Sequence, residues 1–263
     1  MKTIKVELPR ELNHIKVDTL ADIHLGDKEC DFALLQRRIK AIKDDPNMYC
    51  ILNGDLIDNA TTTSIGDTYA STATPMEQIK TCMGLFEPIK DKIIAITDGN
   101  HEGRTYRTDG IDLTWLLARE LRIEKRYHAG AVLLFLRFGA ISRNSKDKTG
   151  KARRVCYTMY IKHGRGGGKR PGGKANRLED MLKVIDTDIY IHSHTHTPMV
   201  LMFNTFRVDT KNSTFAEVEK LAINTGAFLE YGGYGEVAEY TPTSRRTPLL
   251  ILDGTKKDFK ALL

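Results

Sequence analysis

The chain has 263 residues, of which 41% are hydrophobic and 28% charged, and its formal net charge is +6. This length suits one large α/β domain or two small ones, and we expect a single domain over residues 1–263. The longest apolar run, 129–136, ends at Arg137 and is shorter than the roughly 20 residues that a membrane span needs. Residues 1–12 alternate charged with apolar side chains, which argues against a signal peptide. We therefore expect a soluble, cytoplasmic protein without a membrane partner.

The cysteines are scattered along the chain without a CxxC pair. A chain of this length can bury enough core to fold without disulfides. We therefore expect free thiols in a reducing cytoplasm at all of their positions, Cys30, Cys50, Cys82 and Cys156.

Short apolar runs alternate with segments of helical periodicity, which is typical of stacked βαβ units. In chain order we expect strands at 15–22, 48–55 and 92–100 and helices at 31–42, 75–89 and 110–121. The second half adds strands at 131–141, 155–164, 188–196, 199–209, 220–231 and 247–254, and a helix at 175–185. Asp31 and Asp109 are placed to cap the first and third helices. The sequence therefore predicts an α/β fold.

Several of these strands end directly in side chains that bind metals. In α/β sheets, ligand sites are built from the loops at the carboxyl ends of the strands, so the pattern favours one shared site. The side chains concerned are Asp22 and His24, Asp55 and Asp58, Asn100 and His101, His163, and His194 and His196.

Each fragment alone also has an ordinary structural interpretation. Gly-Asp and Gly-Asn are turn dipeptides, and His163 alone is typical of a histidine that packs at a strand end. In an unbroken strand, His192, His194 and His196 point to one face, which suits strand packing as well as metal binding. The ordered series D-x-H, G-D-x-x-D, G-N-H-E, H and H-x-H is more specific, because independent spaced motifs multiply in specificity.

This series resembles that of the calcineurin-like metallophosphoesterases and runs from Asp22 to His196. The resemblance implies a two-sheet αββα sandwich with mixed sheets and two divalent metal ions, with manganese favoured and iron or zinc as alternatives. It implies catalysis by attack of a metal-bridging hydroxide on phosphorus. The implied ligands are Asp22, His24 and His196 for one metal, Asn100, His163 and His194 for the other, and Asp55 as the bridging carboxylate.

The same resemblance assigns roles to two further residues. His101 resembles the catalytic histidine that approaches the leaving-group oxygen, and Asp58 resembles the acid that orients it. His192 matches no ligand position, and we expect it to pack within its strand.

Three positions depart from particular branches of the family. The opening D-I-H-L-G-D is similar to that of the DNA-repair nucleases, which carry aspartate where Glu102 stands. The protein phosphatases place arginine where this chain has Asn59, whereas Arg104 in G-N-H-E-G-R is similar to them. Ser193 replaces the usual glycine before H-x-H, a change that we expect the metal site to tolerate.

The segment 142–177 holds twelve Lys or Arg residues and a single acid, Asp147. Its Gly-rich part, 164–174, follows His163, and glycine lets the backbone pass close to a phosphate while neighbouring cations supply charge. We expect substrate contacts from Arg104, Arg165, Lys169 and Arg170, and together with 142–154 a basic rim that attracts polyanions. The alternative is a flexible, solvated loop.

The sequence thus predicts a metal-dependent phosphoesterase whose substrate is a phosphodiester of a nucleotide or nucleic acid. One alternative is the same chemistry on a phosphomonoester, including a phosphoprotein. Another is a metal-bearing scaffold or nucleic-acid-binding protein without catalysis. The oligomeric state stays open, and a dimer is the expectation from base rates alone.

Overall fold

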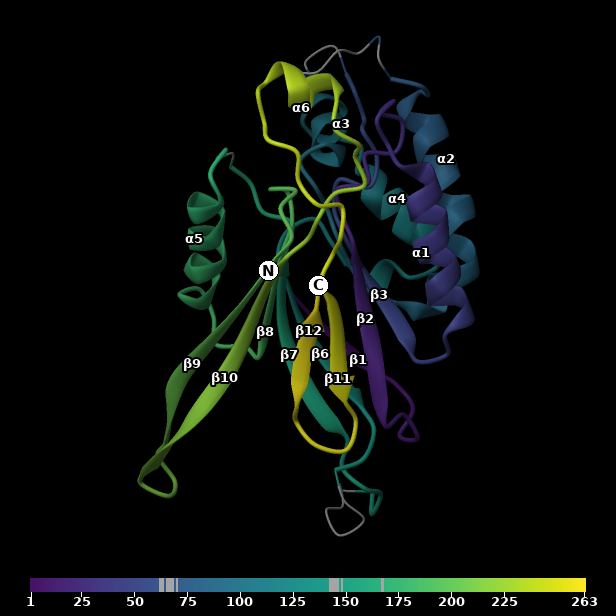
Figure 1. The fold of residues 1–263 in the computed structure, drawn as a ribbon. Helices are drawn as coiled ribbons and strands as arrows, with labels where there is room; N and C mark the ends of the chain where they lie inside the picture. The colour runs from purple at the N-terminus through teal and green to yellow at the C-terminus, as the bar shows by residue number, and fades with distance from the viewer. Residues whose placement is uncertain (62–63, 65–68, 70, 142–146, 148, 167) are drawn as a thin grey trace.

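The computed structural model describes residues 1–61, 64, 69, 71–141, 147, 149–166 and 168–263. In these residues the chain forms two β-sheets packed face to face, with helices on both outer faces (Figure 1). Each sheet contains parallel and antiparallel neighbours. The predicted αββα sandwich with mixed sheets is therefore confirmed.

The first sheet, called sheet A here, has the strand order β1-β6-β7-β8-β10-β9 in the described residues. Strands β7 and β8 run parallel, as do β8 and β10, so their carboxyl ends lie at the same edge. The bounds are β1 (Lys2–Glu7), β6 (Val132–Phe138), β7 (Val155–Lys162), β8 (Ile189–His192), β10 (Thr214–Asn224) and β9 (Met199–Asp209).

The second sheet, sheet B, has the order β12-β11-β2-β3-β4-β5 over the part of the chain that is described. Its strands β2 to β5 run parallel, and β11 joins β2 antiparallel. The bounds are β12 (Phe259–Leu262), β11 (Leu249–Asp253), β2 (His14–Leu20), β3 (Met48–Asn53), β4 (Ile93–Thr97) and β5 (Tyr127–His128).

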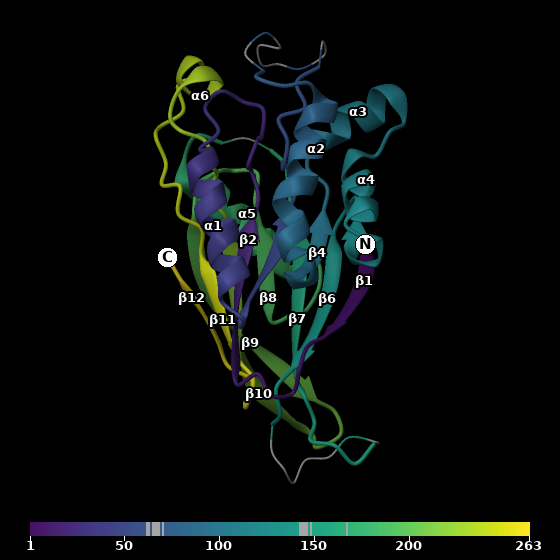
Figure 2. The ribbon, with the colours of Figure 1, turned by 90° about the vertical axis from the view of Figure 1, so that its right-hand side faces the viewer.

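Helices α1, α2 and α4 cover the outer face of sheet B (Figure 2), and α5 covers that of sheet A. Strands β3 and β4 are therefore buried on both faces, which explains their continuous apolar sequences. None of the helices in the described ranges is both long and apolar enough to cross a membrane. The helices are α1 (Phe32–Asp44), α2 (Pro75–Phe86), η2 (Glu87–Lys92), α3 (Glu102–Asp109), α4 (Leu113–Glu120), η3 (Glu124–Arg126), α5 (Pro171–Leu182) and α6 (Gly233–Val237).

The main core lies between the two sheets. Strand β6 alternates buried and half-buried residues along its whole length, as expected for a strand with one face in a core. Ile161 and Ile191 of sheet A are fully buried and share a cluster with Val17 and Ile51 of sheet B. All four cysteines are free, as predicted.

The prediction that Asp109 caps the third helix was wrong. Asp109 is the last residue of α3, which ends where Gly110 adopts a left-handed φ of 71°. The cap of α4 is Asp112, whose side chain accepts a hydrogen bond from the Trp115 amide at 2.7 Å. The predicted single helix thus starts too early, because its first residue, Gly110, separates two short helices.

Tyr157 of sheet A ties the two sheets together. Its fully buried side chain lies among the core residues, and its hydroxyl is 2.7 Å from the carbonyl oxygens of both Asp253 and Asp258. The hydroxyl donates to one of these and accepts from the Asp258 amide at 3.1 Å. The turn between β11 and β12 is thus held by a side chain from the opposite sheet.

We predict that Tyr157→Phe lowers the free energy of unfolding by about 1–2 kcal/mol, because buried backbone groups lose their partner. Tyr160→Phe is the matched control on the same strand, because Tyr160 is also a buried residue but its hydroxyl makes no hydrogen bond within the described residues. Urea denaturation measures both. Equal losses for the two variants would contradict the assigned role of the Tyr157 hydroxyl.

Candidate metal centre

The predicted site residues converge at one end of the sandwich, at the top of Figure 1. They come from the carboxyl ends of β2, β3 and β4 in sheet B and of β7 and β8 in sheet A. The two sheets are connected there by direct contacts. Nδ1 of His163 donates to the Asn53 carbonyl at 2.7 Å, and the His194 amide donates to the Asp22 carboxylate at 3.0 Å.

Two clusters of ligand atoms lie side by side in this region. Within each cluster, one ligand atom per residue lies within 4.8 Å of the others. Nε2 of His163 is 3.1 Å from Oδ2 of Asp55, and this same oxygen lies 4.0 Å from Nε2 of His24 in the other cluster. Asp55 thus faces both groups. The clusters are Asp22, His24 and His196, and Asp55, His163 and His194.

The charges of this site favour bound cations. Asp22 and Asp55 are almost completely buried, and among the described residues only histidines form ion pairs with them. Burial works to raise the pKa of both carboxyls, but the neighbouring histidines, His196 and His163 foremost, hold it below the usual value. Two ionised carboxylates in a dry interior without Lys or Arg need another positive charge.

Burial favours the uncharged form of two histidines of the site, which is the form that binds metals. Burial lowers the pKa of His24, and it lowers that of His194 to about 4. For His163 the charges of Asp55 and Asp22 outweigh burial and raise the pKa to about 10. A metal ion held by Asp55 and His163 would displace the proton from the His163 ring, because metal binding releases protons from its ligands.

Three buried atoms of the implied ligands have no hydrogen-bond partner among the described residues. They are Oδ1 of Asn100, Nε2 of His163 and Nδ1 of His194. A buried polar atom without a partner costs about 1–3 kcal/mol, and native structures contain few of them. All three residues belong to one implied ligand set, so the unpartnered atoms fit a divalent cation bound at that set.

Backbone strain is concentrated at the same residues. A left-handed φ in a residue with a side chain costs roughly 1–2 kcal/mol, and such outliers cluster at functional sites. Here they occur at five of the seven implied ligands: Asp22 (52°), His24 (50°), Asp55 (49°), His194 (68°) and His196 (52°).

The buried carboxylate of Glu102 holds the strained loop of Asp55 in place. It accepts hydrogen bonds from the amides of Asp55 at 3.0 Å and Gly99 at 3.1 Å, and from both residues that follow Asp55. A side chain at Gly99 would place a Cβ 2.1 Å from Oδ1 of Asp55, so this position needs glycine. Burial and the Asp55 charge raise the pKa of Glu102.

His101 lies between Asp58 and Arg104. Its Nδ1 donates to the Asp58 carbonyl oxygen at 2.6 Å, with the Asp58 carboxylate 3.3 Å away, and its Nε2 lies 3.0 Å from Nη2 of Arg104. Burial works to lower the pKa of His101, but Asp58 and Asp55 raise it above the usual value. His101, Asp58 and His24 form a third cluster of ligand type, which shares His24 with the first.

Two of the departures noted in the sequence have structural explanations. Asn59 donates through Nδ2 to the His101 carbonyl at 2.6 Å and accepts from Thr105 at 3.0 Å. Ser193 is fully buried, and its hydroxyl accepts from Asn53 at 2.7 Å. Asn59 and Ser193 thus stabilise the loops of the site through side-chain hydrogen bonds.

His192 lies behind the site rather than in it. It is buried, and its Nδ1 is 2.7 Å from Oδ1 of Asn224. Strand β8 ends at His192, so the alternation of a strand does not extend to His194 and His196. This placement agrees with the packing role expected for His192.

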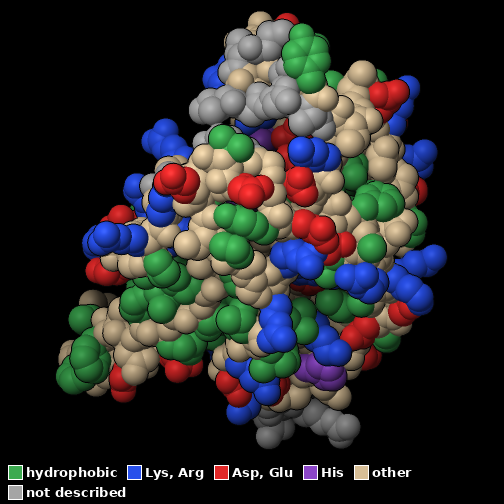
Figure 3. All heavy atoms as spheres, turned by 45° about the horizontal axis from the view of Figure 1, so that its top comes forward, with side chains coloured by type: hydrophobic (Ala, Val, Ile, Leu, Met, Phe, Trp, Pro, Cys, Tyr) green, Lys and Arg blue, Asp and Glu red, His purple; other side chains and the backbone are tan. Residues whose placement is uncertain are grey.

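The expectation of a single basic rim needs correction. Because β6 and β7 are antiparallel neighbours, residues 139–141 and 149–154, which join these strands, lie at the end of β7 opposite to His163, roughly 25 Å away at 3.3 Å per residue. Residues 142–146 and 148 of this stretch lie outside the described part of the chain. On the face in Figure 3, Lys and Arg side chains lie scattered among acidic ones.

The Gly-rich segment does border the site. Arg165, Lys169 and Arg170 are exposed there, and Nζ of Lys169 lies 3.6 Å from Glu239 and 5.9 Å from the ring centre of Tyr240. The described cations Lys151, Arg153 and Arg154, in contrast, precede β7 at the opposite end of that strand from His163.

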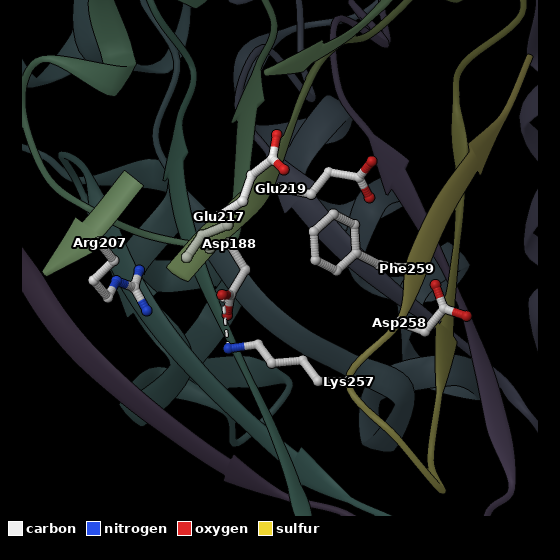
Figure 4. Close-up of a pocket in the computed structure, with 8 residues that line it drawn as sticks. Asp188, Arg207, Glu217, Glu219, Lys257, Asp258 and Phe259 are labelled. Carbon is white, nitrogen blue, oxygen red and sulfur yellow. Dashed lines mark ion pairs between the residues drawn. The ribbon is translucent and has the colours of Figure 1, made fainter. Parts of the chain in front are cut away.

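A separate hollow of about 320 Å³ lies between β10 and the β11–β12 turn (Figure 4). It contains an ion pair: Lys257 lies 2.7 Å from Asp188, which also accepts from the Thr158 amide and hydroxyl at 2.7 Å. Asp188 precedes β8, whereas the ligand histidines follow it. The hollow therefore lies at the opposite end of β8 from the candidate metal centre.

The comparison with protein-family models decides the family. The model of the calcineurin-like phosphoesterases matches residues 15–198, more than half of the chain. The chain belongs to the calcineurin-like phosphoesterases. The resemblance seen in its motifs is thereby confirmed, and members of this family are metal-dependent hydrolases of phosphoesters. Among curated proteins there is no significant match.

Three solved structures are similar at low identity. A predicted phosphoesterase from Streptococcus pneumoniae shares 12% identity at a TM-score of 0.37, with 95% of this chain and 88% of that one covered. Nuclease MPE from Pseudomonas putida shares 15% at 0.35, with coverages of 94% and 87%. A double mutant of Vps29 from Entamoeba histolytica shares 15% at 0.32, with coverages of 80% and 97%. Scores this low carry no argument about function.

Sequence reasoning missed the residues that support the ligands. The motifs mark Glu102 only as a difference between branches of the family, and they do not reveal that it accepts from backbone amides. Asn53 belongs to none of the motifs, although it contacts the Ser193 and Thr97 hydroxyls. A polar residue at the end of the otherwise apolar strand β3 was the available signal for Asn53.

We predict that Glu102→Gln lowers the free energy of unfolding by about 2–3 kcal/mol. The side-chain NH₂ of glutamine would face backbone N–H groups that now donate to a carboxylate oxygen, and the charge that strengthens these hydrogen bonds would be lost. Glu120→Gln, at the exposed end of α4, is the control. Denaturant titration of both variants tests this. A Glu102→Gln protein as stable as the control would show that the carboxylate does not hold the loop.

Proposed function

We propose that this calcineurin-like phosphoesterase hydrolyses phosphodiesters of a nucleotide or nucleic acid with two divalent metal ions, manganese in the first place. The observation that carries the proposal is the pair of adjacent ligand clusters around Asp22 and Asp55, two buried carboxylates with only histidines as ionic partners among the described residues. Bound divalent cations would supply a hydroxide nucleophile at neutral pH and neutralise phosphoryl charge. The proposed ligands are the seven that the sequence motifs indicate.

His101 is proposed to protonate the leaving-group oxygen. Its Nδ1–H is engaged by the Asp58 carbonyl, and its Nε2 lies 4.0 Å from Oδ2 of Asp55. Nε2 accepts from Arg104 at 3.0 Å, so it takes up a proton once Arg104 turns to a substrate phosphate. The Asp58 carboxylate raises the pKa of His101 and so keeps its proton available near neutral pH. Asp58 thereby orients the ring and stabilises its charged form.

Arg104 is proposed to contact the phosphate. Its guanidinium lies beside Nε2 of His101, and it donates to the Asp58 carbonyl at 3.0 Å. A guanidinium matches two phosphoryl oxygens at once, so a substrate phosphate can draw it toward the metals.

The preference for a diester rests on the exposed cations of the Gly-rich segment. Arg165, Lys169 and Arg170 can bind phosphates on either side of the scissile bond. A monoester offers no such neighbouring phosphates. Turnover of monoesters alone would move the proposal to a phosphomonoesterase or protein phosphatase.

We predict that protein stripped of metal and reloaded with Mn²⁺ hydrolyses bis-p-nitrophenyl phosphate faster than p-nitrophenyl phosphate. His101→Ala should lower kcat by about 10²–10⁴, because it removes a general acid. Asp55→Asn should abolish turnover, since it removes the carboxylate shared by both clusters. The visible absorbance of the released p-nitrophenolate measures each rate.

His14→Ala is the matched control, because His14 is exposed at the far end of β2. It should retain wild-type turnover. Wild-type protein that binds two metals but hydrolyses neither ester would favour the scaffold alternative.

We predict that Asp58→Asn moves the loss of activity at high pH to lower pH. His101 must carry a proton to act as the acid, and the protonated fraction falls as pH rises through its pKa. Removing the Asp58 charge lowers that pKa, so the fall begins earlier. The pH profile of kcat shows where activity begins to fall. An unchanged profile at high pH would contradict the role assigned to Asp58.

A further inference from the structure

Lys174 differs from the other cations of the Gly-rich segment because it points inward. It stands in the first turn of α5 with only 9% of its surface exposed. Its Nζ donates to the Thr195 carbonyl at 3.0 Å and to the Thr197 hydroxyl at 2.6 Å. Thr195 lies between His194 and His196, so this lysine holds the loop that carries both histidines.

A buried ammonium is costly to maintain. Among the described residues no carboxylate pairs with Lys174, and burial lowers its pKa. An apolar side chain of similar length, such as methionine, would fill the same space without the cost of removing the charge from water. The hydrogen bonds that Lys174 makes must therefore offset this cost.

The loop that Lys174 holds is under backbone strain. His194 and His196 adopt left-handed φ angles of 68° and 52° on either side of Thr195. The neighbouring carbonyls are also held, that of His196 by the Thr243 hydroxyl at 2.8 Å and that of Thr197 by Asn224 at 2.6 Å. Lys174 supplies the restraint at the centre, where release would let both strained residues relax.

We propose that Lys174 is a positioning residue that aims His194 and His196, one histidine from each ligand cluster, at the two metal ions. The inference rests on the proposed metal function. Besides offering cations to the substrate, the Gly-rich segment would then support the metal ligands. It begins directly after His163 and ends at Lys174, which holds the loop of His194 and His196. The ligands of both clusters are thus tied to one short stretch of chain.

The test measures metal binding, independently of activity. Wild type, Lys174→Met and Lys174→Gln are titrated with Co²⁺, and the visible absorption bands report affinity and ligand geometry. We expect affinity to fall by about tenfold to a hundredfold in Lys174→Met, the range found when a residue that orients metal ligands is lost. Lys174→Gln, which keeps a donor without the charge, should restore part of the affinity.

Lys183→Met is the matched control, because Lys183 directly follows α5 but is exposed. It should bind Co²⁺ as wild type does. Thr197→Val provides a milder loss of the same contact if Lys174→Met does not fold, and it should also weaken binding. Thermal unfolding of the metal-free variants separates a general loss of stability from a loss of ligand alignment.

Wild-type affinity and spectrum in Lys174→Met or, if that protein does not fold, in Thr197→Val would overturn the inference while leaving the metal function intact. A variant that loses stability but, when folded, binds Co²⁺ unchanged would overturn it in the same way. Wild-type protein that binds no Co²⁺ would instead overturn the proposed function and this inference with it.

Discussion

The site depends on keeping two ionised carboxylates, Asp22 and Asp55, inside a dry interior. Neither has a Lys or Arg partner in the described part of the chain. The histidines around them can be positively charged when protonated, or offer a nitrogen lone pair to a metal when neutral. Such an arrangement is unfavourable until cations enter it. The strained backbones at five of the implied ligands add a second unfavourable contribution at the same place. Metal binding would offset both.

The sandwich provides the rigidity that this arrangement needs. Parallel strands in each sheet end at one edge, and contacts such as His163 to the Asn53 carbonyl join the two edges. Glu102 then holds the Asp55 loop, and Lys174 holds the loop of His194 and His196. The implied ligands thus lie on short loops that follow the strands, and buried hydrogen bonds hold the backbone of these loops in place.

The sequence predicted the ligand-bearing strand ends because each pairs a strong apolar run with a motif of defined spacing. It predicted the helices after β4 less well: it missed α3 and started the next helix at Gly110, whereas Asp112 rather than Asp109 forms the cap of α4. It grouped the Gly-rich cations with Lys151, Arg153 and Arg154, which lie at the other end of β7, because charge along the chain does not reveal at which end of a strand a loop lies. The inward direction of Lys174 depends on tertiary packing and has no local signal.

The central claim is that two metal ions occupy the adjacent clusters. The most direct test is a crystal structure of the Mn²⁺-loaded protein with anomalous diffraction recorded at the manganese edge. We expect two anomalous peaks roughly 3.5–4 Å apart, with Asp55 between them and Asn100, His163 and His194 around one of the two. A single peak at His24, Asp58 and His101, or peaks away from both clusters, would contradict the claim.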